Sequence, residues 1–396
     1  MATHARTGSP TRRAWTSGVA LAVLALGAVA CTPEPSPSLP ACPARQEVQL
    51  EPADPVNFSL PRAVSADGQW LVASRVVGAD MTFALRRTTT DVTATAVGTL
   101  PYAQVAGGAL LVSVPADGSL VVFGTGGTAA TETAPQTTLR RWRAATGTVG
   151  DLPVPIVSAP PPGVPYPVNA VAVSADGRRV LWTQSFREGP EPYVWHRVLV
   201  VTDSATDAVV STASIDGSWT GWVTGDGAAY LDGSRLVASA TGVATDLNPD
   251  VAAAQAAFPG PQLYVAGISD DLRFLALRRY DASALPGLYT YLVWDRVSGT
   301  GRVALQVPTT GQVGQPQILL NAVAPGGSLL VTQWSSPPAL GDVLASDPTA
   351  GVLTVAHSAT VLTPLFSWAV TTTDGRTVVV SRQGLLGQQL VAERCA

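Results

Sequence analysis

A four-residue motif that recurs seven times along the chain does most to limit the folds available to it. Its usual form is Ser-x-Asp-Gly before an apolar run, as in Ser65-Ala66-Asp67-Gly68 before Leu71. The fourth positions of the copies are Gly68, Gly118, Gly177, Gly227, Leu272, Gly327 and Gly375. Copies spaced by 45 to 59 residues indicate a repeat architecture, in which each unit packs against its neighbours.

Each repeat is predicted to contain antiparallel strands joined by tight turns. Asp-Gly supplies the positive φ angle of a tight hairpin turn, and the apolar run after it is typical of a strand covered on both faces. A second turn signal follows several runs, for example Asp295 before Ser298-Gly299. Residues 218–247 show four short strands in outline, SWTGWV, AAYL, SRLVAS and VATDL. This pattern predicts an all-β fold, a seven-bladed β-propeller of four-stranded antiparallel blades over residues 45–396.

The repeats resemble those of TolB-like and WD40-like propellers. The resemblance rests on the Ser-x-Asp-Gly turns and on Val293-Trp294-Asp295 before Ser298-Gly299, and it covers residues 45–395. The chain departs from true WD repeats, because only Trp294-Asp295 matches their Trp-Asp pattern. The resemblance implies the propeller fold and leaves function open, since this architecture serves scaffolds, receptors and enzymes.

The two ends of the repeat region are predicted to meet in one blade. The last copy has room for three strands within residues 367–394, and Arg45–Leu50 is a strand candidate without a partner of its own. We expect this N-terminal strand to complete the last blade and close the ring, which leaves no open sheet edge. Cys42 and Cys395 would then be neighbours, and two cysteines in an oxidising compartment are expected to form a disulfide.

The N-terminal residues have the pattern of an export signal. Residues 1–30 contain three arginines and no acid, and they end in an apolar run over 19–30. This pattern is typical of a secretory signal peptide, and the run is short for a membrane-spanning helix. Ala28-Val29-Ala30-Cys31 resembles the lipobox of bacterial lipoproteins. The resemblance implies that Cys31 is acylated, palmitate included, and that the protein is anchored to a membrane without crossing it.

Two features of the export region stay open. Cys31 could be incidental beside an ordinary cleaved signal peptide, and Thr11-Arg12-Arg13-Ala14-Trp15 loosely resembles a twin-arginine motif. Residues 31–44 are rich in proline and are predicted to be an extended tether between the lipid and the propeller. The expected location is the extracytoplasmic face of the cell membrane.

The charge balance excludes several classes of function. All 24 basic residues are arginines, so chemistry that needs a side-chain amine, such as Schiff-base formation, is excluded. Removal of residues 1–30 removes three arginines and no acid, which changes the formal net charge from −4 to −7. An acidic domain lacks the clustered positive charge that nucleic-acid binding needs, so no nucleic-acid partner is expected.

Catalytic and metal-binding motifs are nearly absent from the sequence. His196 and His357 are the only histidines after residue 30, and no HExxH, HxH, CxxC or GxSxG pattern occurs. Residues 124–129 (GTGGTA) have the spacing of a dinucleotide-binding motif, but a Thr/Ala/Pro-rich stretch replaces the helix that the motif requires. The repeated aspartates lack the spacing of a calcium loop and are explained by turn formation. We therefore expect no metal and no cofactor.

Candidate binding residues lie between the second and third strands of three repeats, opposite to the Asp-Gly turns. Residues 184–195, 278–289 and 334–342 are predicted to be loops there. Aromatic and arginine side chains on such loops are enriched at recognition surfaces. Packing of the aromatic residues between blades is the alternative interpretation. The candidates are Phe186, Arg187, Glu188, Tyr193, Trp195, Arg278, Arg279, Tyr280, Asp281 and Trp334.

Three hypotheses for function follow from the sequence. The first is a monomeric, non-catalytic, envelope-anchored propeller that binds an envelope protein or glycan and touches the membrane through its lipid alone. The second is an envelope enzyme, a glycan- or peptide-processing hydrolase or lyase, that uses carboxylates in the propeller channel. The third is a structural protein without a ligand. Acids clustered on the channel strands would favour the enzyme, and acids confined to turns would favour the binding protein.

Overall fold

The computed structural model describes the chain in segments. These are residues 45–54, 58–89, 93–106, 109–126, 137–155, 168–188, 194–214, 222, 224, 228–238, 241, 243–284, 287–308, 317–324, 326–334, 339–346, 353–361, 369–372, 374–384 and 387–395. Residues 1–36 and 37–396 form separate compact units. The predicted signal peptide, the tether, Cys31 and Cys42 lie outside the described residues. Within the described segments, no helix is long and apolar enough for a membrane span.

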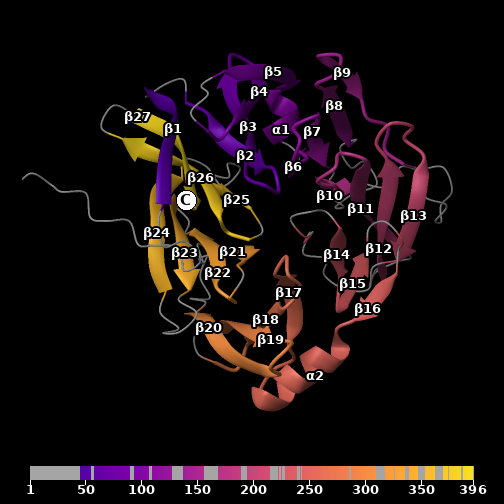
Figure 1. Cartoon of the computed structure of the whole chain (residues 1–396), viewed down its shortest axis with the longest axis vertical. Coiled ribbons are helices and arrows are strands. Elements are labelled where there is room, and N and C mark those ends of the chain that lie inside the picture. Colours follow the sequence, from indigo (N-terminus) through magenta and orange to yellow (C-terminus); the bar gives the residue numbers. More distant parts are fainter. Residues whose placement is uncertain are drawn as a thin grey trace, which may run out of the picture. The chain divides into compact units, whose positions relative to one another are not determined.

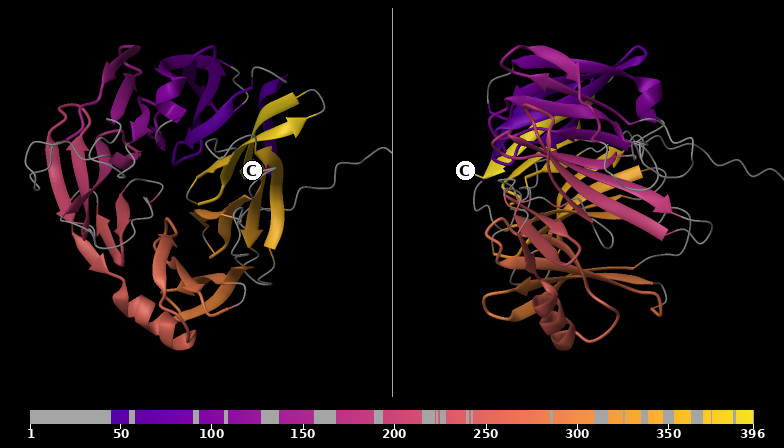
Figure 2. Two further views of the ribbon diagram at one scale, coloured as in Figure 1. Left: turned by 180° about the vertical axis from the view of Figure 1, so that it is seen from behind. Right: turned by 90° about the vertical axis from the view of Figure 1, so that its right-hand side faces the viewer.

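The second unit is a β-propeller built of antiparallel sheets that follow one another along the chain (Figures 1 and 2). Its first three four-stranded sheets keep the strands in chain order. They comprise β2 (Leu60–Val64), β3 (Trp70–Val77), β4 (Asp80–Arg87) and β5 (Ala94–Pro101), then β6 (Ala109–Ser113), β7 (Leu120–Gly126), β8 (Thr138–Arg143) and β9 (Thr148–Asp151), then β10 (Val168–Val173), β11 (Arg179–Glu188), β12 (Val194–Asp203) and β13 (Val209–Ser214).

Three further four-stranded sheets and one three-stranded sheet complete the described residues of the unit. The three-stranded sheet holds β14 (Ala229–Asp232), β15 (Arg235–Ala238) and β16 (Ala244–Asp246). Two four-stranded sheets follow, β17 (Tyr264–Ile268), β18 (Phe274–Asp281), β19 (Leu288–Asp295) and β20 (Thr300–Pro308), then β21 (Gln317–Val323), β22 (Leu329–Trp334), β23 (Ala339–Ser346) and β24 (Leu353–Val361). The last sheet has the order β1 (Arg45–Asp54), β27 (Gly387–Cys395), β26 (Thr377–Gly384) and β25 (Ala369–Thr371).

The prediction of seven four-stranded blades needs a correction. The described residues form six four-stranded blades, and the sheet over residues 229–246 has three strands. The strand expected at 218–223 lies outside the described residues, except for Trp222.

The N-terminal strand β1 pairs with the C-terminal strand β27. The two are antiparallel, with Arg45 opposite Cys395 and Val48 opposite Ala392. β1 is thus the outermost strand of a sheet whose other three strands come from the end of the chain (Figure 1). It runs from Arg45 to Asp54 and is four residues longer than the predicted Arg45–Leu50 segment.

The repeated motif builds the turn between the first and second strands of a blade. In the first copy Ser65 Oγ donates to Asp67 Oδ1 (2.6 Å), which also accepts from the backbone N–H of Gln69 (3.0 Å). The backbone N–H of Trp70 donates to Ser65 Oγ (2.9 Å), and Gly68 has a φ of 69°. The same bonds recur in the copies that begin at Ser174, Ser269 and Thr372. The aspartates of these copies are therefore turn-forming residues.

Apolar side chains pack between neighbouring sheets, so that most blade strands are covered on both faces. Phe83 of β4 and Phe123 of β7 meet at 4.9 Å between ring centroids, within a cluster shared by the first two sheets. Leu71 and Ala73 of β3 share a cluster with Val379, Leu390 and Ala392 of the last sheet. The first strands also adjoin, since β2 contacts β6 and β25, β6 contacts β10, and β21 contacts β17 and β25. These first strands are the innermost strands of the propeller.

Two short helices connect sheets. α1 (Tyr102–Ala106) follows β5, and α2 (Asn248–Ala257) joins the three-stranded sheet to β17. α2 begins with a proline in its first turn and contains five alanines, both favourable for a helix. Arg296 Nε donates to Asp250 Oδ2 of α2 (2.9 Å). This ion pair joins α2 to the turn between β19 and β20.

Candidate functional site

About half of the residues in the three segments predicted as binding loops belong to strands. β11 continues to Glu188, β18 to Asp281 and β22 to Trp334, and the next strands begin at Val194, Leu288 and Ala339. The prediction of long loops was wrong in extent, because backbone pairing continues where the apolar pattern stops. Arg279 still pairs with Thr290, and Tyr280 with Tyr289. The candidate residues therefore have positions fixed by strand register.

Six candidates have side chains outside the described residues. Phe186, Arg187 and Glu188 end β11, opposite His196, Trp195 and Val194 of β12. Tyr193 itself lies outside the described residues, and Trp334 is the last residue of β22. The backbone pairing places Phe186, Arg187, Glu188, Trp195 and Trp334 near the ends of hairpins.

The β18–β19 hairpin brings tyrosines and one arginine onto one face of its sheet. Tyr280 and Tyr289 are paired residues, and their rings lie 4.7 Å apart at an angle of 35°. Arg278 is paired with Tyr291 on one side and with Tyr264 of β17 on the other. Directly paired residues share a face, and residues two apart on a strand share it too. We call these five residues the tyrosine platform.

Some side chains of the tyrosine platform are exposed and others are buried. Tyr264 and Tyr280 keep 54% and 45% of their surface exposed, whereas Tyr291 is buried. Burial raises the pKa of Tyr291 above its ordinary value, and the positive charge of nearby Arg278 opposes the rise. The Tyr291 phenol thus stays neutral at physiological pH and lies beside Arg278, its partner on the neighbouring strand. The exposed rings and the guanidinium of Arg278, which is partly buried, remain available to a ligand.

Two other candidates on this hairpin have structural partners. Arg279 Nη1 donates to the backbone carbonyls of Phe258 (2.9 Å) and Pro259 (3.1 Å), just after α2. Asp281 Oδ1 accepts from the Ser283 hydroxyl (2.6 Å) and backbone N–H (2.9 Å), and these bonds lower the pKa of Asp281. Arg279 therefore secures the end of α2, and Asp281 shapes the hairpin turn.

Tyr264 was not among the residues predicted from sequence. It stands at the start of β17, 14 residues before Arg278 in the chain, and only the β17–β18 register places it beside that arginine. The local sequence PQLYVAGI reads as an ordinary strand. A register prediction for the preceding strand would have been the one signal able to find it.

Metal-ligating side chains do not gather in the part of the chain that the structure describes. No three of its His, Cys, Asp and Glu residues lie close enough to hold an ion. His196 belongs to β12 and His357 to β24, in separate sheets. The platform itself offers aromatic faces and a guanidinium, groups suited to stacking and to hydrogen bonding with oxygen atoms.

Comparison with solved structures finds other propellers. The chain is similar to TolB from Acinetobacter baumannii, with 12% identity, a TM-score of 0.30, and 71% of this chain and 52% of that one covered. It is similar to the β-propeller domain of the Trilobed protease from Pyrococcus furiosus, with 10% identity and a TM-score of 0.44. This match covers 85% of this chain and 95% of that one. It is also similar to oligogalacturonate lyase from Vibrio parahaemolyticus, with 10% identity and a TM-score of 0.47. This match covers 88% of this chain and 93% of that one. The chain thus spans about half of the TolB structure.

Two further comparisons gave no match. No protein-family model matches the sequence, and no curated protein matches it. The fold rests on the sheets described above.

Proposed function

We propose that this chain is a non-catalytic, envelope-anchored propeller that binds a protein or a glycan of the cell envelope. The observation that carries the proposal is the ring contact between Tyr280 and Tyr289, beside half-exposed Tyr264 and partly buried Arg278. Tyrosine and arginine supply most of the energy at many recognition surfaces, because they bury much area at little cost in side-chain entropy. The face of an exposed tyrosine also suits the apolar face of a sugar ring.

The platform is preorganised for binding. Its rings stand on paired strands, and the register of these strands fixes Arg278 between Tyr264 and the buried Tyr291. Side chains already held in place lose less conformational freedom when a partner binds. A mobile loop of the same composition would bind more weakly.

The proposal includes a ring of seven blades closed by β1. Two backbone hydrogen bonds support a further strand beside β14, from Leu231 N–H to the Trp222 carbonyl (3.1 Å) and from Thr224 N–H to the Ala229 carbonyl (2.9 Å). With that strand, the three-stranded sheet becomes a seventh blade. The pairing of β1 with β27 supports closure, as does the apolar cluster shared by Leu71 and Val379.

The proposal also includes the lipid anchor and the disulfide. Acylation of Cys31 would hold the propeller at the membrane through the Pro-rich residues 32–44. Cys42 precedes Arg45 by three residues, and Arg45 pairs with Cys395, a spacing that an extended chain can bridge. A disulfide there would join the two ends of the propeller.

The acids support binding over catalysis in the channel. The described innermost strands have the sequences LPRAV, ALLVS, VNAVAV, YVAGI, QILLNAV and AVT, without Asp or Glu. The aspartates of the repeats lie in turns instead. An enzyme with two channel carboxylates would need at least one acid on these strands or on the loops that join them.

Capture of partners by the full lipidated protein tests the binding proposal. The double variant Tyr264→Ala/Tyr280→Ala removes the two exposed rings, and Val297→Ala is the control on the same sheet. Val297 lies in the β19–β20 turn, on the Asp-Gly side, and is 78% exposed. Envelope glycan fragments and crosslinked envelope proteins are captured in parallel. We expect one of the two classes to bind the wild type and the control, and to bind the double variant at least about tenfold more weakly.

Equal capture by all three proteins would contradict the platform as the binding surface. Intact mass with and without reduction tests the Cys42–Cys395 bond, since two free thiols would contradict it. Fractionation of Cys31→Ser tests the anchor. We expect this variant in the soluble fraction, and retention in the membrane would contradict acylation at Cys31.

A further inference from the structure

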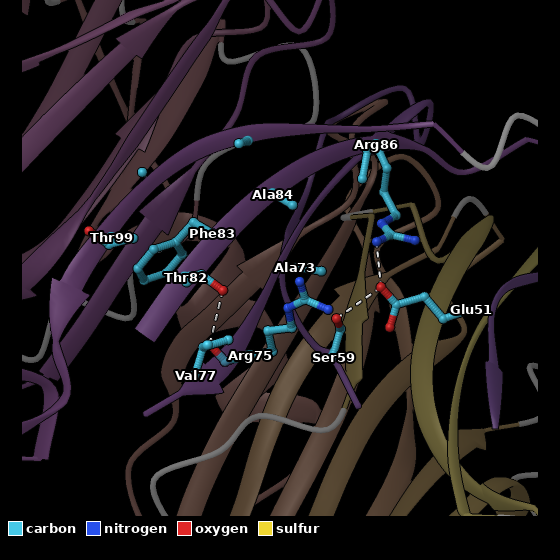
Figure 3. A pocket seen from close by; sticks show the side chains of 13 residues that line it. Glu51, Ser59, Ala73, Arg75, Val77, Thr82, Phe83, Ala84, Arg86 and Thr99 are labelled. Carbon is cyan, nitrogen blue, oxygen red and sulfur yellow. Dashed lines mark hydrogen bonds and ion pairs between the residues drawn. The ribbon is translucent and has the colours of Figure 1, made fainter. Parts of the chain in front are cut away.

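A cavity of about 440 Å³ lies beside the first sheet, next to the N-terminal strand β1 (Figure 3). Its floor consists of Ala73, Ala84, Ala96 and Gly98, which come from the adjacent strands β3, β4 and β5. Ala73 pairs with Ala84 and Ala84 with Ala96, so these methyl groups form one row across the sheet. Ala73 is buried against the last sheet, whereas Ala84 is partly exposed and Ala96 is exposed, so the row is open to a ligand on its β4 and β5 side.

One side of the cavity carries a buried ion pair. Arg86 of β4, only 7% exposed, forms an ion pair with Glu51 of β1, and its Nη1 donates to the Leu50 carbonyl (3.0 Å). Ser59 Oγ donates to Glu51 Oε1 (2.9 Å). The pair joins the first sheet to the last sheet, and the charges of Arg86 and Glu51 cancel each other.

Two cationic groups in the cavity have unused donors. Arg86 Nε is buried and has no acceptor among the described residues. Arg75 of β3 is exposed, and its guanidinium has no ion pair or hydrogen bond within the described segments. In Figure 3 the Arg75 side chain extends from β3 towards Ser59. Because Glu51 balances Arg86, the charged residues that line the cavity have a net charge of one positive unit, supplied by Arg75.

We propose that this cavity binds a carboxylate on a small apolar body, such as the C-terminal residues of a peptide or a free short-chain acid. A carboxylate has a single negative charge and a planar pair of oxygens that match a guanidinium. The row of alanines accepts methyl or methylene groups but has little to offer a sugar hydroxyl. The volume falls within the range of small-ligand sites. This site is separate from the tyrosine platform, which belongs to the β17–β20 sheet.

A carboxylate fits the donors better than a phosphate does. A phosphate group carries up to two negative charges, and the cavity offers one uncompensated cation. The second guanidinium is already engaged by Glu51 and can give only its free Nε–H to a ligand. A carboxylate satisfies both by placing one oxygen at Arg75 and one near Arg86.

Calorimetric titration of the full chain with three probes tests the proposal. The probes are acetyl-Ala-Ala-Ala with a free carboxylate, the same peptide as its C-terminal amide, and butyrate. We expect the peptide acid to bind at least about tenfold more tightly than the amide, since a charged hydrogen-bond pair has roughly that worth. Butyrate binding as tightly as the peptide acid would identify a free small acid as the ligand, and weaker binding would identify a peptide terminus.

Three variants connect binding to the cavity. Arg75→Gln removes the exposed charge and should weaken binding of the peptide acid by about tenfold or more. Ala96→Leu fills the floor from an exposed position and should abolish binding while the charges remain. Arg178→Gln alters an arginine in the turn before β11, whose side chain is 81% exposed, and should leave affinity unchanged. Equal affinity for acid and amide, no binding of either, or wild-type affinity in Arg75→Gln would overturn the proposal.

Discussion

Gly68, in the first Asp-Gly turn, lies against Thr377 at the start of β26, so closely that a methyl group at position 68 would overlap Thr377 Oγ1. Gly118 has the same relationship with Trp70, since a Cβ on Gly118 would lie 2.5 Å from Trp70 Cε2. In both cases the turn glycine of one sheet contacts the first residue of the second strand in the neighbouring sheet. In the pair Gly68–Thr377 this contact joins the first sheet to the last one.

Substitution of Gly68 by alanine should destabilise the propeller more than substitution of Gly147. Both glycines have positive φ angles, 69° and 64°, so each alanine costs about 1–2 kcal/mol for its backbone conformation. Only Gly68→Ala adds overlap with Thr377, whereas nothing lies within 4 Å of a Cβ at position 147. We expect a further loss of about 1–3 kcal/mol in the free energy of unfolding, measured in urea. Equal losses would contradict the close contact.

Acid should weaken the turns that contain an ionised aspartate. Asp295 accepts hydrogen bonds from Arg273 Nε (3.0 Å) and Nη2 (2.7 Å), which lower the pKa of Asp295 most, and from the Val297 backbone. Its pKa is lower folded than unfolded, so the stabilisation is present above the unfolded value of about 4 and is lost as pH falls through the folded value. We expect Asp295→Asn to show a lower Tm at pH 6 and a shallower decline in Tm below about pH 4.

Asp151→Asn is the matched control for that experiment. The Asp151 carboxylate is 92% exposed and lies 3.9 Å from Arg140 Nε. An exposed pair of this kind contributes little to stability. The variant should follow the wild-type Tm across the pH range, and a pH profile of Asp295→Asn that also follows it would refute the role given to Asp295.

Loss of Arg279 should loosen α2 without affecting ligand capture. Its Nη1 donates to the carbonyls of Phe258 and Pro259, and a charged donor contributes about 1.5–3 kcal/mol. We expect Arg279→Ala to speed amide hydrogen exchange over residues 248–262 and to leave capture by the tyrosine platform within about twofold of the wild type. A loss of capture without faster hydrogen exchange would show instead that Arg279 belongs to the binding surface.

Removal of one partner of the Arg86–Glu51 pair should lower the free energy of unfolding more than removal of both partners. Glu51→Gln leaves a guanidinium with 8% side-chain exposure beside a neutral group, and we expect a loss of about 3 kcal/mol. The double variant Arg86→Met/Glu51→Gln leaves no charge at either position and should recover much of this loss. The two unfolding free energies in urea, together with that of Arg86→Met, complete a double-mutant cycle. Additive losses would show that the pair contributes no coupling.

The repeat pattern predicted most of the fold because each turn is a local structure. Ser65, Asp67 and Gly68 satisfy one another within four residues, so the motif implies the turn wherever it occurs. The fifth copy keeps the turn although Leu272 replaces glycine and takes a φ of 58°. Helix α2 escaped the prediction, because an alanine-rich connection does not interrupt the repeat on either side of it.

The candidate site was only partly predictable. Arg278 and Tyr280 were found because aromatic and arginine residues near a hairpin end are visible in the sequence. Tyr264 and the burial of Tyr291 depend on the pairing of three strands. The cavity beside Glu51 had no local signal, since its residues come from β1 and from the first sheet.

Sequence alone determined the repeats and their turns, since these follow from local hydrogen bonding and strand patterning. It also indicated that the N-terminal strand pairs with the last blade, because the last repeat has room for only three strands of its own. Only the tertiary structure decided which residues share a surface. The register of β17, β18 and β19 set the tyrosine platform, and packing of β1 against the first sheet buried the pair Arg86–Glu51. Register and packing between sheets depend on side chains far apart in the chain, and no local pattern encodes them.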